Sequence, residues 1–197
     1  SNSMVIYDLK EDKSIGEVAT ESWPHSIDMD FNNKLLFVSN LESDSITVIS
    51  MDNYDTVENI QVPEYPTKIK VSNDGKRIYI CCSYVGKDKR GYIDILNIGN
   101  FQRIARVMVG YSPIDMIEDA DNIYVSNFTD GTISVIGKRT YTVEKVIYVG
   151  GMPKGILKYG SVLYVADYLK SKLILIEDDK IIKVIAIESE PNAMTLF

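Results

Sequence analysis

The repeat that decides the fold is most complete at residues 124–153, which read YVSNFTDGTISVIGKRTYTVEKVIYVGGMP. Three short segments rich in Val, Ile, Tyr and Thr are separated here by turn residues, and the stretch ends at a proline. Segments of this composition and length predict β-strands. The same order recurs along the chain, with successive marker prolines 38 to 47 residues apart: Pro24, Pro66, Pro113, Pro153 and Pro191. Repeats of this period are typical of propellers and solenoids.

Each complete repeat predicts four strands. An apolar residue stands three positions after every marker proline and belongs to the first strand: Ile27, Ile69, Met116, Ile156 and Met194. A turn follows, of which Asp74-Gly75 is the strongest hairpin signal. In the third repeat the remaining strands are predicted at 123–126, 132–136 and 143–149. No segment has a helical period, so the chain is predicted to be all-β.

Many predicted strands are apolar on both faces, as in residues 173–176, which read LILI. A strand of this kind belongs to a sheet that is covered on both sides. A four-stranded unit of about 40 residues that packs between copies of itself is a propeller blade. We therefore expect one β-propeller domain over residues 1–197, with four complete antiparallel blades at 24–63, 66–110, 113–151 and 153–188.

The amino-acid pattern of the repeat resembles that of a known family. The pattern IYVSN…GTISVI…TVEKVIYVGGMP, together with VSNDGKRIYI, is similar to the YVTN-type β-propeller repeat of bacterial and archaeal proteins, among them surface-layer-related ones. Residues 152–167, MPKGILKYGSVLYVAD, are also similar to the NHL propeller repeat. Both resemblances imply the propeller fold over nearly the whole chain and leave the function open.

The two ends of the chain hold parts of a further unit. Residues 5–9 and 15–19 read as a third and a fourth strand, and 192–197 read as a lone first strand. We expect 4–20 and 191–197 to join into a closing blade without a second strand, which gives about five blades, while residues 1–3 fit an expression remnant. The alternative is a part of a larger propeller, since the YVTN-type family more often has about seven blades.

Energetics favour covered ends over bare ones. A blade face of roughly 300 Å² that stays uncovered forgoes about 8 kcal/mol of apolar burial. This rivals the total stability of a typical domain. We therefore expect a closed or nearly closed ring, or a homodimer in which a second copy covers the open ends.

Composition excludes several classes of partner. The 197 residues carry a net charge of −7, whereas nucleic acids and anionic membranes require a basic surface. The apolar runs are too short to span a bilayer, and no apolar leader precedes the first strand. We expect no nucleic-acid partner and no membrane insertion. The localisation is open between the cytoplasm, if no leader was removed, and the cell surface that the resemblance implies.

Residues suited to catalysis are few. His25 is the only histidine, and the GxSxG pattern of serine hydrolases is absent. Cys81 and Cys82 are adjacent, so their side chains point to opposite faces of a strand, and we expect two reduced thiols rather than a disulfide or a metal pair. Loop oxygens such as those of Asp44 and Asp130 fit strand caps better than a Ca²⁺ site. We expect no enzyme activity, no metal and no cofactor.

Aromatic and charged residues recur in two sets of loops. The loops before first strands and after second strands are expected at the same end of the propeller, so these side chains predict a ligand-binding mouth: Trp23, His25, Tyr65, Lys68, Tyr111, Asp115, Phe128, Lys154 and Tyr168. The alternative is packing of loop against loop. The insertion at 84–91 carries three basic residues and is read as a solvated loop, with a contact for an acidic partner as the alternative.

Three functions from different classes follow from the sequence. The first is a non-enzymatic recognition scaffold that binds a protein, a peptide or a glycan at the mouth. The second, implied by the resemblance to surface-layer proteins, is a structural module of the cell surface. The third, which the resemblance also allows, is a propeller enzyme of the lactonase or lyase kind. The residues favour the first, and the ligand stays open.

Overall fold

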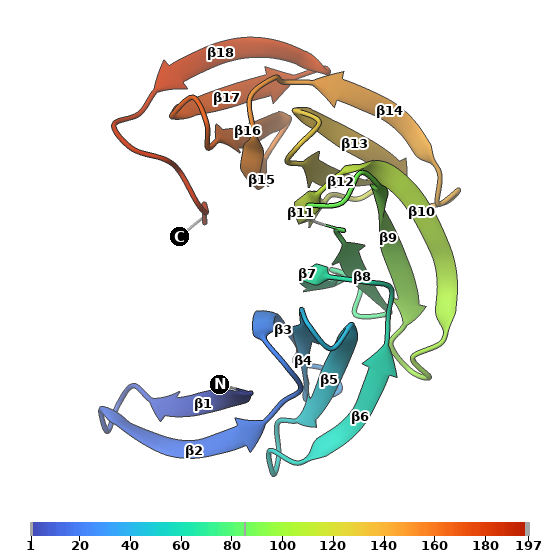
Figure 1. The fold of residues 1–197 in the computed structure, drawn as a ribbon, viewed down its shortest axis with the longest axis vertical. Coiled ribbons are helices and arrows are strands. Elements are labelled where there is room, and N and C mark those ends of the chain that lie inside the picture. The colour runs from blue at the N-terminus through green and yellow to red at the C-terminus, as the bar shows by residue number, and fades with distance from the viewer. Residues whose placement is uncertain (1, 85, 196–197) are drawn as a thin grey trace.

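The computed structural model describes residues 2–84 and 86–195. These residues form 18 strands and no helix, so they contain no helix that is long and apolar enough to cross a bilayer. The strands pair in four sheets of four and one sheet of two. Figure 1 shows the sheets side by side along an arc, with the first strand of each four-stranded sheet nearest the centre. The chain is therefore an all-β propeller of about five units, as predicted.

The N-terminal sheet consists of β1 (Ser3–Asp8) and β2 (Lys13–Ala19). Blade 1 contains β3 (Pro24–Asp30), β4 (Leu35–Asn40), β5 (Ser45–Ser50) and β6 (Thr56–Gln61). Blade 2 contains β7 (Pro66–Val71), β8 (Arg77–Cys82), β9 (Arg90–Asn97) and β10 (Arg103–Tyr111). Blade 3 contains β11 (Pro113–Glu118), β12 (Asn122–Asn127), β13 (Thr132–Gly137) and β14 (Val143–Tyr148). Blade 4 contains β15 (Pro153–Tyr159), β16 (Val162–Asp167), β17 (Lys172–Glu177) and β18 (Lys180–Ala186).

Each marker proline of the four blades is the first residue of an innermost strand. Proline has no N–H to donate, so it fits the start of a strand whose inner edge faces the channel. The residue before it has a positive φ in three blades, with 60° at Trp23, 58° at Tyr65 and 52° at Ser112. This left-handed residue turns the chain from the outer strand of one blade to the inner strand of the next.

The core lies between the blades rather than within one layer. One buried cluster joins blade 1 to blade 2, a second joins blade 2 to blade 3, and a third joins blade 3 to blade 4. A smaller cluster joins the N-terminal sheet to blade 1 through Met4, Ile6, Leu36 and Val38. Each complete sheet between two others is thus covered on both faces, which explains why its strands are apolar on both sides.

One pair of positions recurs at every interface between blades. An aromatic residue of the second strand faces the residue five positions after the next marker proline. Phe37 shares a buried apolar cluster with Val71 between blades 1 and 2. The Tyr79 hydroxyl donates to the Glu118 carboxylate, 3.4 Å away, between blades 2 and 3. In the remaining pair, between blades 3 and 4, the Lys158 ammonium lies over the Tyr124 ring.

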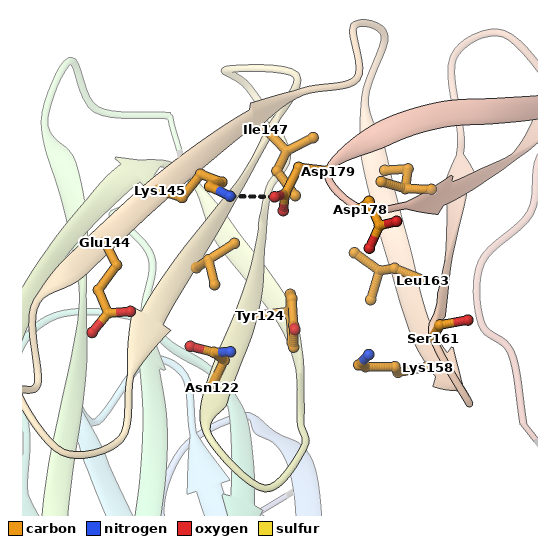
Figure 2. Close-up of a pocket in the computed structure, with 12 residues that line it drawn as sticks. Asn122, Tyr124, Glu144, Lys145, Ile147, Lys158, Ser161, Leu163, Asp178 and Asp179 are labelled. Atoms are coloured by element: carbon orange, nitrogen blue, oxygen red, sulfur yellow. Dashed lines mark hydrogen bonds and ion pairs between the residues drawn. The ribbon is translucent and has the colours of Figure 1, made fainter.

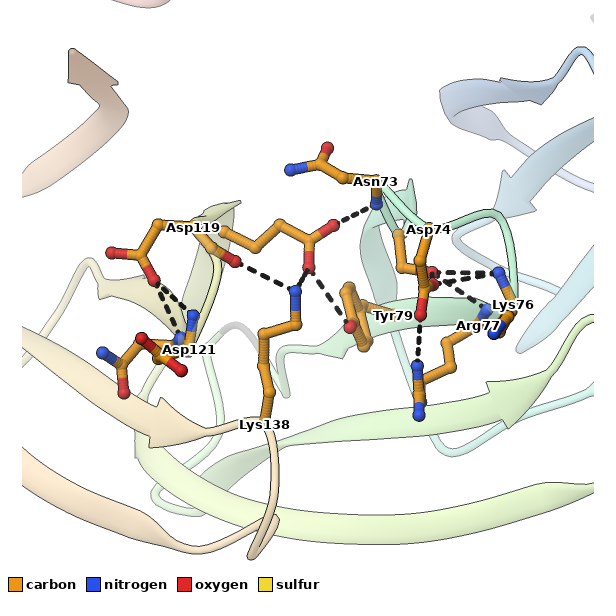
Figure 3. A network of polar contacts seen from close by, with 11 residues as sticks. Asn73, Asp74, Lys76, Arg77, Tyr79, Asp119, Asp121 and Lys138 are labelled. Atoms are coloured by element: carbon orange, nitrogen blue, oxygen red, sulfur yellow. Dashed lines mark hydrogen bonds and ion pairs between the residues drawn. The ribbon is translucent and has the colours of Figure 1, made fainter. Parts of the chain in front are cut away.

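Glu118 is a buried charge whose neighbours satisfy it, among them Asn73, Tyr79 and Lys138, which are labelled in Figure 3. The Lys138 ammonium forms an ion pair with it and also donates to the Asp119 carbonyl oxygen, 2.9 Å away. The Asn73 backbone N–H donates to its other oxygen across the blade interface. Burial, together with the Glu118 charge, raises the pKa of Tyr79, which therefore stays a neutral donor. A paired and fully hydrogen-bonded carboxylate is tolerated in a core, and it joins blade 2 to blade 3.

The asparagine of the IYVSN pattern has a structural role. Asn127 is buried at the end of β12 and donates to the hydroxyls of Thr132 and Ser134, 3.0 and 2.9 Å away. Its side-chain oxygen accepts the Gly110 backbone N–H at 3.1 Å, so it ties the second and third strands of blade 3 to β10 of blade 2. Asn40 repeats the two donations in blade 1, to Ser45 and Thr47.

The ends of the chain differ from the prediction. The described residues of the segment after β18, up to residue 195, contain no strand, and residues 196 and 197 of the predicted final strand lie outside the described part. The expected pairing of 191–197 with 4–20 is therefore not formed among the described residues, and Figure 1 shows an open arc with β1–β2 and blade 4 on either side of the opening. Over residues 2–84 and 86–195, no second strand lies between this segment and β1, so a first strand there has no neighbour to pair with.

Replacement of Asn127 by alanine should lower the free energy of unfolding by about 2–3 kcal/mol, because the buried Gly110 N–H and two hydroxyls lose their partner. Asn40→Ala is the matched control. The carbonyl oxygen of Asn40 has no partner among the described residues, so this variant should cost about 1 kcal/mol less. Urea unfolding followed by circular dichroism measures both. Equal losses would show that the bond to Gly110 contributes nothing.

Candidate functional site

The loops before first strands and after second strands meet at one end of the arc. In every complete blade the carbonyl oxygen of the residue before the marker proline accepts the N–H of the residue after the second strand. The donors in blades 1 to 4 are Leu41, Ser83, Phe128 and Tyr168, and the acceptors are Trp23, Tyr65, Ser112 and Met152, at 2.9 to 3.0 Å. This bond holds the two loops of each blade together, so their side chains surround the same end of the channel.

A hollow of about 540 Å³ opens at this end of the channel. Its lining comes from all four complete blades and from the C-terminal segment: His25, Ser26, Leu41, Tyr65, Thr67, Lys68, Ile114, Asp115, Lys154, Asn192 and Ala193. We call it the mouth. It brings together five of the nine residues that the sequence predicts for a ligand site, namely His25, Tyr65, Lys68, Asp115 and Lys154. Its apolar and hydrogen-bonding side chains are mixed, as in many ligand sites.

The residue directly after each marker proline lines the mouth. These residues are His25, Thr67, Ile114, Lys154 and Asn192. The predicted ligand site was chosen from aromatic and charged residue types, so it did not include six of the lining residues: Ser26, Leu41, Thr67, Ile114, Asn192 and Ala193. The position after the proline is the signal that would have found Thr67 and Ile114, because the innermost strand of every unit starts there and faces the channel.

Contacts between blades hold the polar groups of the mouth. The Nδ1 atom of His25 lies 2.8 Å from the Thr67 carbonyl oxygen, which links blade 1 to blade 2. The Lys68 ammonium lies 3.3 Å from the Asp115 carboxylate, which links blade 2 to blade 3. The other oxygen of Asp115 accepts the Ile156 backbone N–H of blade 4 at 3.1 Å. Because every contact crosses a blade interface, the polar groups of the mouth are positioned by the stacking of the blades.

The C-terminal segment contributes the last side of the mouth. The Lys154 ammonium donates to the Asn192 side-chain oxygen at 2.6 Å and lies 4.6 Å from the centre of the Tyr168 ring. Glu190 accepts a hydrogen bond from the Tyr168 hydroxyl, and this bond raises the pKa of Tyr168. The segment therefore continues the series of post-proline residues beside blade 4, although it forms no strand there.

The remaining predicted residues lie outside the mouth. Trp23 is 56% exposed and borders a separate hollow with Asn2, Ser3, Pro24 and Glu42. Phe128 and Tyr168 form a tilted ring pair with centres 6.2 Å apart. The Tyr111 backbone N–H donates to the Asp130 carboxylate at 3.0 Å, so this residue is fixed at the end of β10. The five aromatic residues thus do not form one continuous rim.

The carboxylates and amides that a Ca²⁺ site would use serve as caps instead. Asp44 accepts the backbone N–H of Tyr65 at 2.9 Å, and Asp167 accepts those of Met152 and Lys170 at 3.0 and 3.2 Å. Over residues 2–84 and 86–195, no group of three or more His, Cys, Asp or Glu side chains is placed to hold a metal ion. These oxygens stabilise the loops that shape the mouth.

A second hollow, of about 370 Å³, lies at the opposite end, between blades 3 and 4 (Figure 2). Figure 2 shows the ion pair between Lys145 and Asp179 bridging the two blades, with Tyr124 and Lys158 on facing walls. The Tyr124 hydroxyl donates to Asp119 at 2.9 Å, and the Lys158 ammonium lies 3.4 Å from the same carboxylate. Burial, and then the bond to Asp119, raise the pKa of Tyr124 to about 12. Two ion pairs of this hollow, Lys145 with Asp179 and Lys158 with Asp119, hold blades 3 and 4 together.

Replacement of Asp119 by asparagine should lower the melting temperature at neutral pH and have less effect in acid. Burial works against the charge of Asp119, but hydrogen bonds from Asn122, Tyr124 and Asp121 and the charge of Lys158 outweigh it and lower its pKa below 3.8. The stability it contributes is complete above that ordinary value and is lost as the pH falls through the lowered pKa. Calorimetry of both proteins at pH 7 and in acid measures the gap, and a gap independent of pH would contradict this.

The two cysteines lie on opposite faces of β8, as predicted. Cys81 belongs to the cluster shared with blade 3, and Cys82 to the cluster shared with blade 1. Both are free and fully buried. Burial raises the pKa of both thiols, which disfavours the thiolate that reacts.

A thiol reagent at pH 8 should therefore modify neither cysteine in the folded protein. Addition of urea past the unfolding midpoint should release two equivalents together, because both thiols become exposed in the same transition. Cys81→Ala should reduce the unfolded count to one without creating reactivity in the folded state. Rapid modification of the folded protein would show that blade 2 opens locally.

Comparisons with known proteins support the fold. No protein-family model and no curated protein matches the sequence. Solved structures do match: a chain described as Kuenenia stuttgartiensis hydrazine synthase is similar over 90% of this chain, with a TM-score of 0.80 and 22% sequence identity. This chain spans 57% of the length of that chain. At this identity the likeness shows the propeller fold alone, and a fold that 1077 solved chains match carries no function by itself.

Proposed function

We propose that this protein is a non-enzymatic recognition scaffold that binds a protein segment, a peptide or a glycan at the mouth. The observation that carries this proposal is the 540 Å³ hollow lined by the post-proline residue of every repeat. It joins apolar side chains, such as those of Leu41 and Ile114, to cationic ones on a framework fixed by contacts between blades. Such a preformed, mixed lining suits binding with little reorganisation.

The groups at the mouth are arranged for contact rather than for proton transfer. The single histidine is oriented by a backbone carbonyl, at 2.8 Å from Thr67. The Asp115 carboxylate is already engaged by Lys68 and by the Ile156 N–H. A general base needs a free, oriented acceptor, and a covalent mechanism needs a nucleophile beside it. The Thr67 contact leaves Nε2 of His25 as an oriented acceptor, but no contact of this ring with a nucleophile is found among the described residues, and the engaged Asp115 is not free to act; both points support recognition over catalysis.

An extended acidic peptide fits the mouth best among the three ligand classes. Lys68 and Lys154 bring two ammonium groups to the hollow, against one carboxylate from Asp115, although the whole chain carries a charge of −7. Local charge of this kind sets the orientation and the rate of association. The apolar lining and the Tyr65 ring would supply most of the contact area.

Selection from a random peptide library and a glycan array, using the whole chain as bait, tests the proposal. The selected ligand should bind His25→Ala and Lys154→Ala about tenfold more weakly, since each change removes a polar contact at the mouth. Trp23→Ala is the matched control, because Trp23 lies at the same end but borders another hollow. Isothermal titration gives the affinities, and melting curves exclude unfolding.

Two results would contradict the proposal. One is an affinity that falls as much with Trp23→Ala as with the two mouth variants. The other is a selected ligand that binds both mouth variants normally and protects the opposite end of the blades from hydrogen exchange.

A further inference from the structure

The turn between the third and the fourth strand carries an aromatic residue in blades 1, 2 and 3. Six residues separate the last paired positions of these strands, namely 50–55, 97–102 and 137–142. The fifth of the six is aromatic in each blade: Tyr54, Phe101 and Tyr141. Its φ is positive, between 51° and 62°, and its N–H donates to the carbonyl oxygen of the first turn residue at 2.8 to 2.9 Å. The three turns thus share one backbone geometry.

The turn rings of blades 2 and 3 fill space between their own blade and the preceding one. Phe101 packs against the cluster that joins blades 1 and 2 and lies edge-on to Phe37, with ring centres 6.3 Å apart. Tyr141 packs against the cluster that joins blades 2 and 3, which contains Tyr79. The Tyr141 hydroxyl oxygen accepts a hydrogen bond from the Arg77 guanidinium. Both second-strand rings, Phe37 and Tyr79, are fully buried.

Blade 4 has no such ring. Its turn is shorter by two residues, and the four at the equivalent place, 177–180, read EDDK. The hollow of about 370 Å³ between blades 3 and 4 lies here, lined by Asp178 and Asp179 of the turn and by Tyr124 of β12 (Figure 2). Tyr124 is only half-buried, unlike its counterparts Phe37 and Tyr79. The hollow is therefore the space that a turn ring fills at the two preceding interfaces.

The lining of this hollow suits an aromatic ring that carries a hydroxyl group. Four apolar side chains contribute to its walls: Val135, Ile147, Leu163 and Ile176. Asn122 also lines it and is the first residue of β12, just as Arg77 is the first residue of β8. A side-chain amide, like a guanidinium, donates hydrogen bonds to a phenol oxygen. A ring placed as Tyr141 is placed between blades 2 and 3 would therefore bring its hydroxyl to Asn122.

We propose that the hollow between blades 3 and 4 binds a small phenol, whose ring lies edge-on to Tyr124 and whose hydroxyl accepts a hydrogen bond from Asn122. Edge-on aromatic pairs are favourable beyond the apolar area that they bury. A hollow of about 370 Å³ is within the range of small-molecule sites. Both blades that form it have all four strands. The site lies at the opposite end from the mouth, so the function proposed for the mouth can fail without affecting it.

Other sources of a ring match the hollow less well. The ion pair between Lys145 and Asp179 bridges the two blades beside it (Figure 2). A free phenol can enter beside this pair, whereas a tyrosine of another protein has to bring its backbone with it. The described segment after β18 lies at the mouth, where Asn192 accepts the Lys154 ammonium, and so does not reach the hollow. A small molecule is therefore the occupant that the geometry favours.

4-Methylphenol, which is the side chain of tyrosine without its backbone, is the probe. In an NMR titration of the whole chain it should shift the amide signals of Tyr124, Leu163 and Asp178 saturably, with a Kd of about 0.1–1 mM for a ligand of this size. Toluene, which lacks the hydroxyl, should bind about fivefold more weakly. 4-Methylcyclohexanol, which lacks the flat ring, should bind about tenfold more weakly. No shift of these three amides, or shifts confined to the mouth, would overturn the proposal.

Asn122→Ala tests the contact with the hydroxyl. The variant should bind 4-methylphenol about fivefold more weakly, because the phenol oxygen loses its donor, and it should bind toluene as the unchanged chain does. Toluene is thus the control for any change in the shape of the hollow. Equal weakening of both ligands would overturn the assignment of a phenol.

A graft supplies the missing ring from the chain's own sequence. Residues 137–142, GKRTYT, in place of 177–180 should give blade 4 the long turn of blade 3. The graft should raise the melting temperature by several degrees and abolish binding of 4-methylphenol, because its tyrosine occupies the hollow. The same graft with serine in place of the tyrosine is the matched control, since it also loses the ion pair of Asp179, and it should still bind. Equal binding by the two grafts would overturn the proposal.

Two further measurements distinguish the sources of the ring. The pentapeptide Gly-Gly-Tyr-Gly-Gly should bind more weakly than 4-methylphenol, because its backbone meets the ion pair of Lys145. A peptide that binds about tenfold more tightly would make a protein side chain the occupant and overturn the proposal. Amide shifts of Tyr124 that grow with the concentration of the protein alone would also overturn it, because a second copy would then fill the hollow.

Discussion

The structure depends on the stacking of one sheet face on the next. A four-stranded blade of this sequence is apolar on both faces, and a sheet of that kind is stable only between two others. The buried clusters therefore lie between neighbouring blades and link residues about one repeat apart in the chain. The same requirement orders the inner strands around the channel and brings the post-proline residues of all units together at the mouth. The stacking of the blades thus stabilises the fold and also positions the residues of the mouth.

Fold and strand positions were readable from the sequence because they are local and repeated. The marker prolines, the apolar residue three positions later and the turns recur in each unit, and the innermost strands of the four blades begin at those prolines. The opposite orientation of Cys81 and Cys82 was also readable, since it follows from the geometry of an extended strand alone. Periodicity was a strong guide because a strand predicted in one repeat can be compared with the same positions of the other repeats.

The mouth was harder to predict, because it depends on how blades sit around the channel. Residue type suggested an aromatic rim, but Trp23 borders a separate hollow, and Tyr111 is held at the end of β10 by Asp130. The residue types of Thr67 and Ile114 do not indicate a ligand site, so only their position directly after a marker proline identifies them. The course of the C-terminal segment depends on pairing partners that the repeat pattern alone does not supply.

The pair of facing residues differs in chemistry from one blade interface to the next. Phe37 meets an apolar residue, Tyr79 meets a carboxylate, and Tyr124 meets an ammonium group. If these contacts were alike, blade 2 could stack on blade 4 during folding and leave blade 3 outside, an error to which chains of similar repeats are prone. In the wrong order, Lys158 of blade 4 would lose the Asp119 carboxylate of blade 3 and be buried without a counter-charge, which is costly. The three different pairs thus favour the observed order of the blades along the arc.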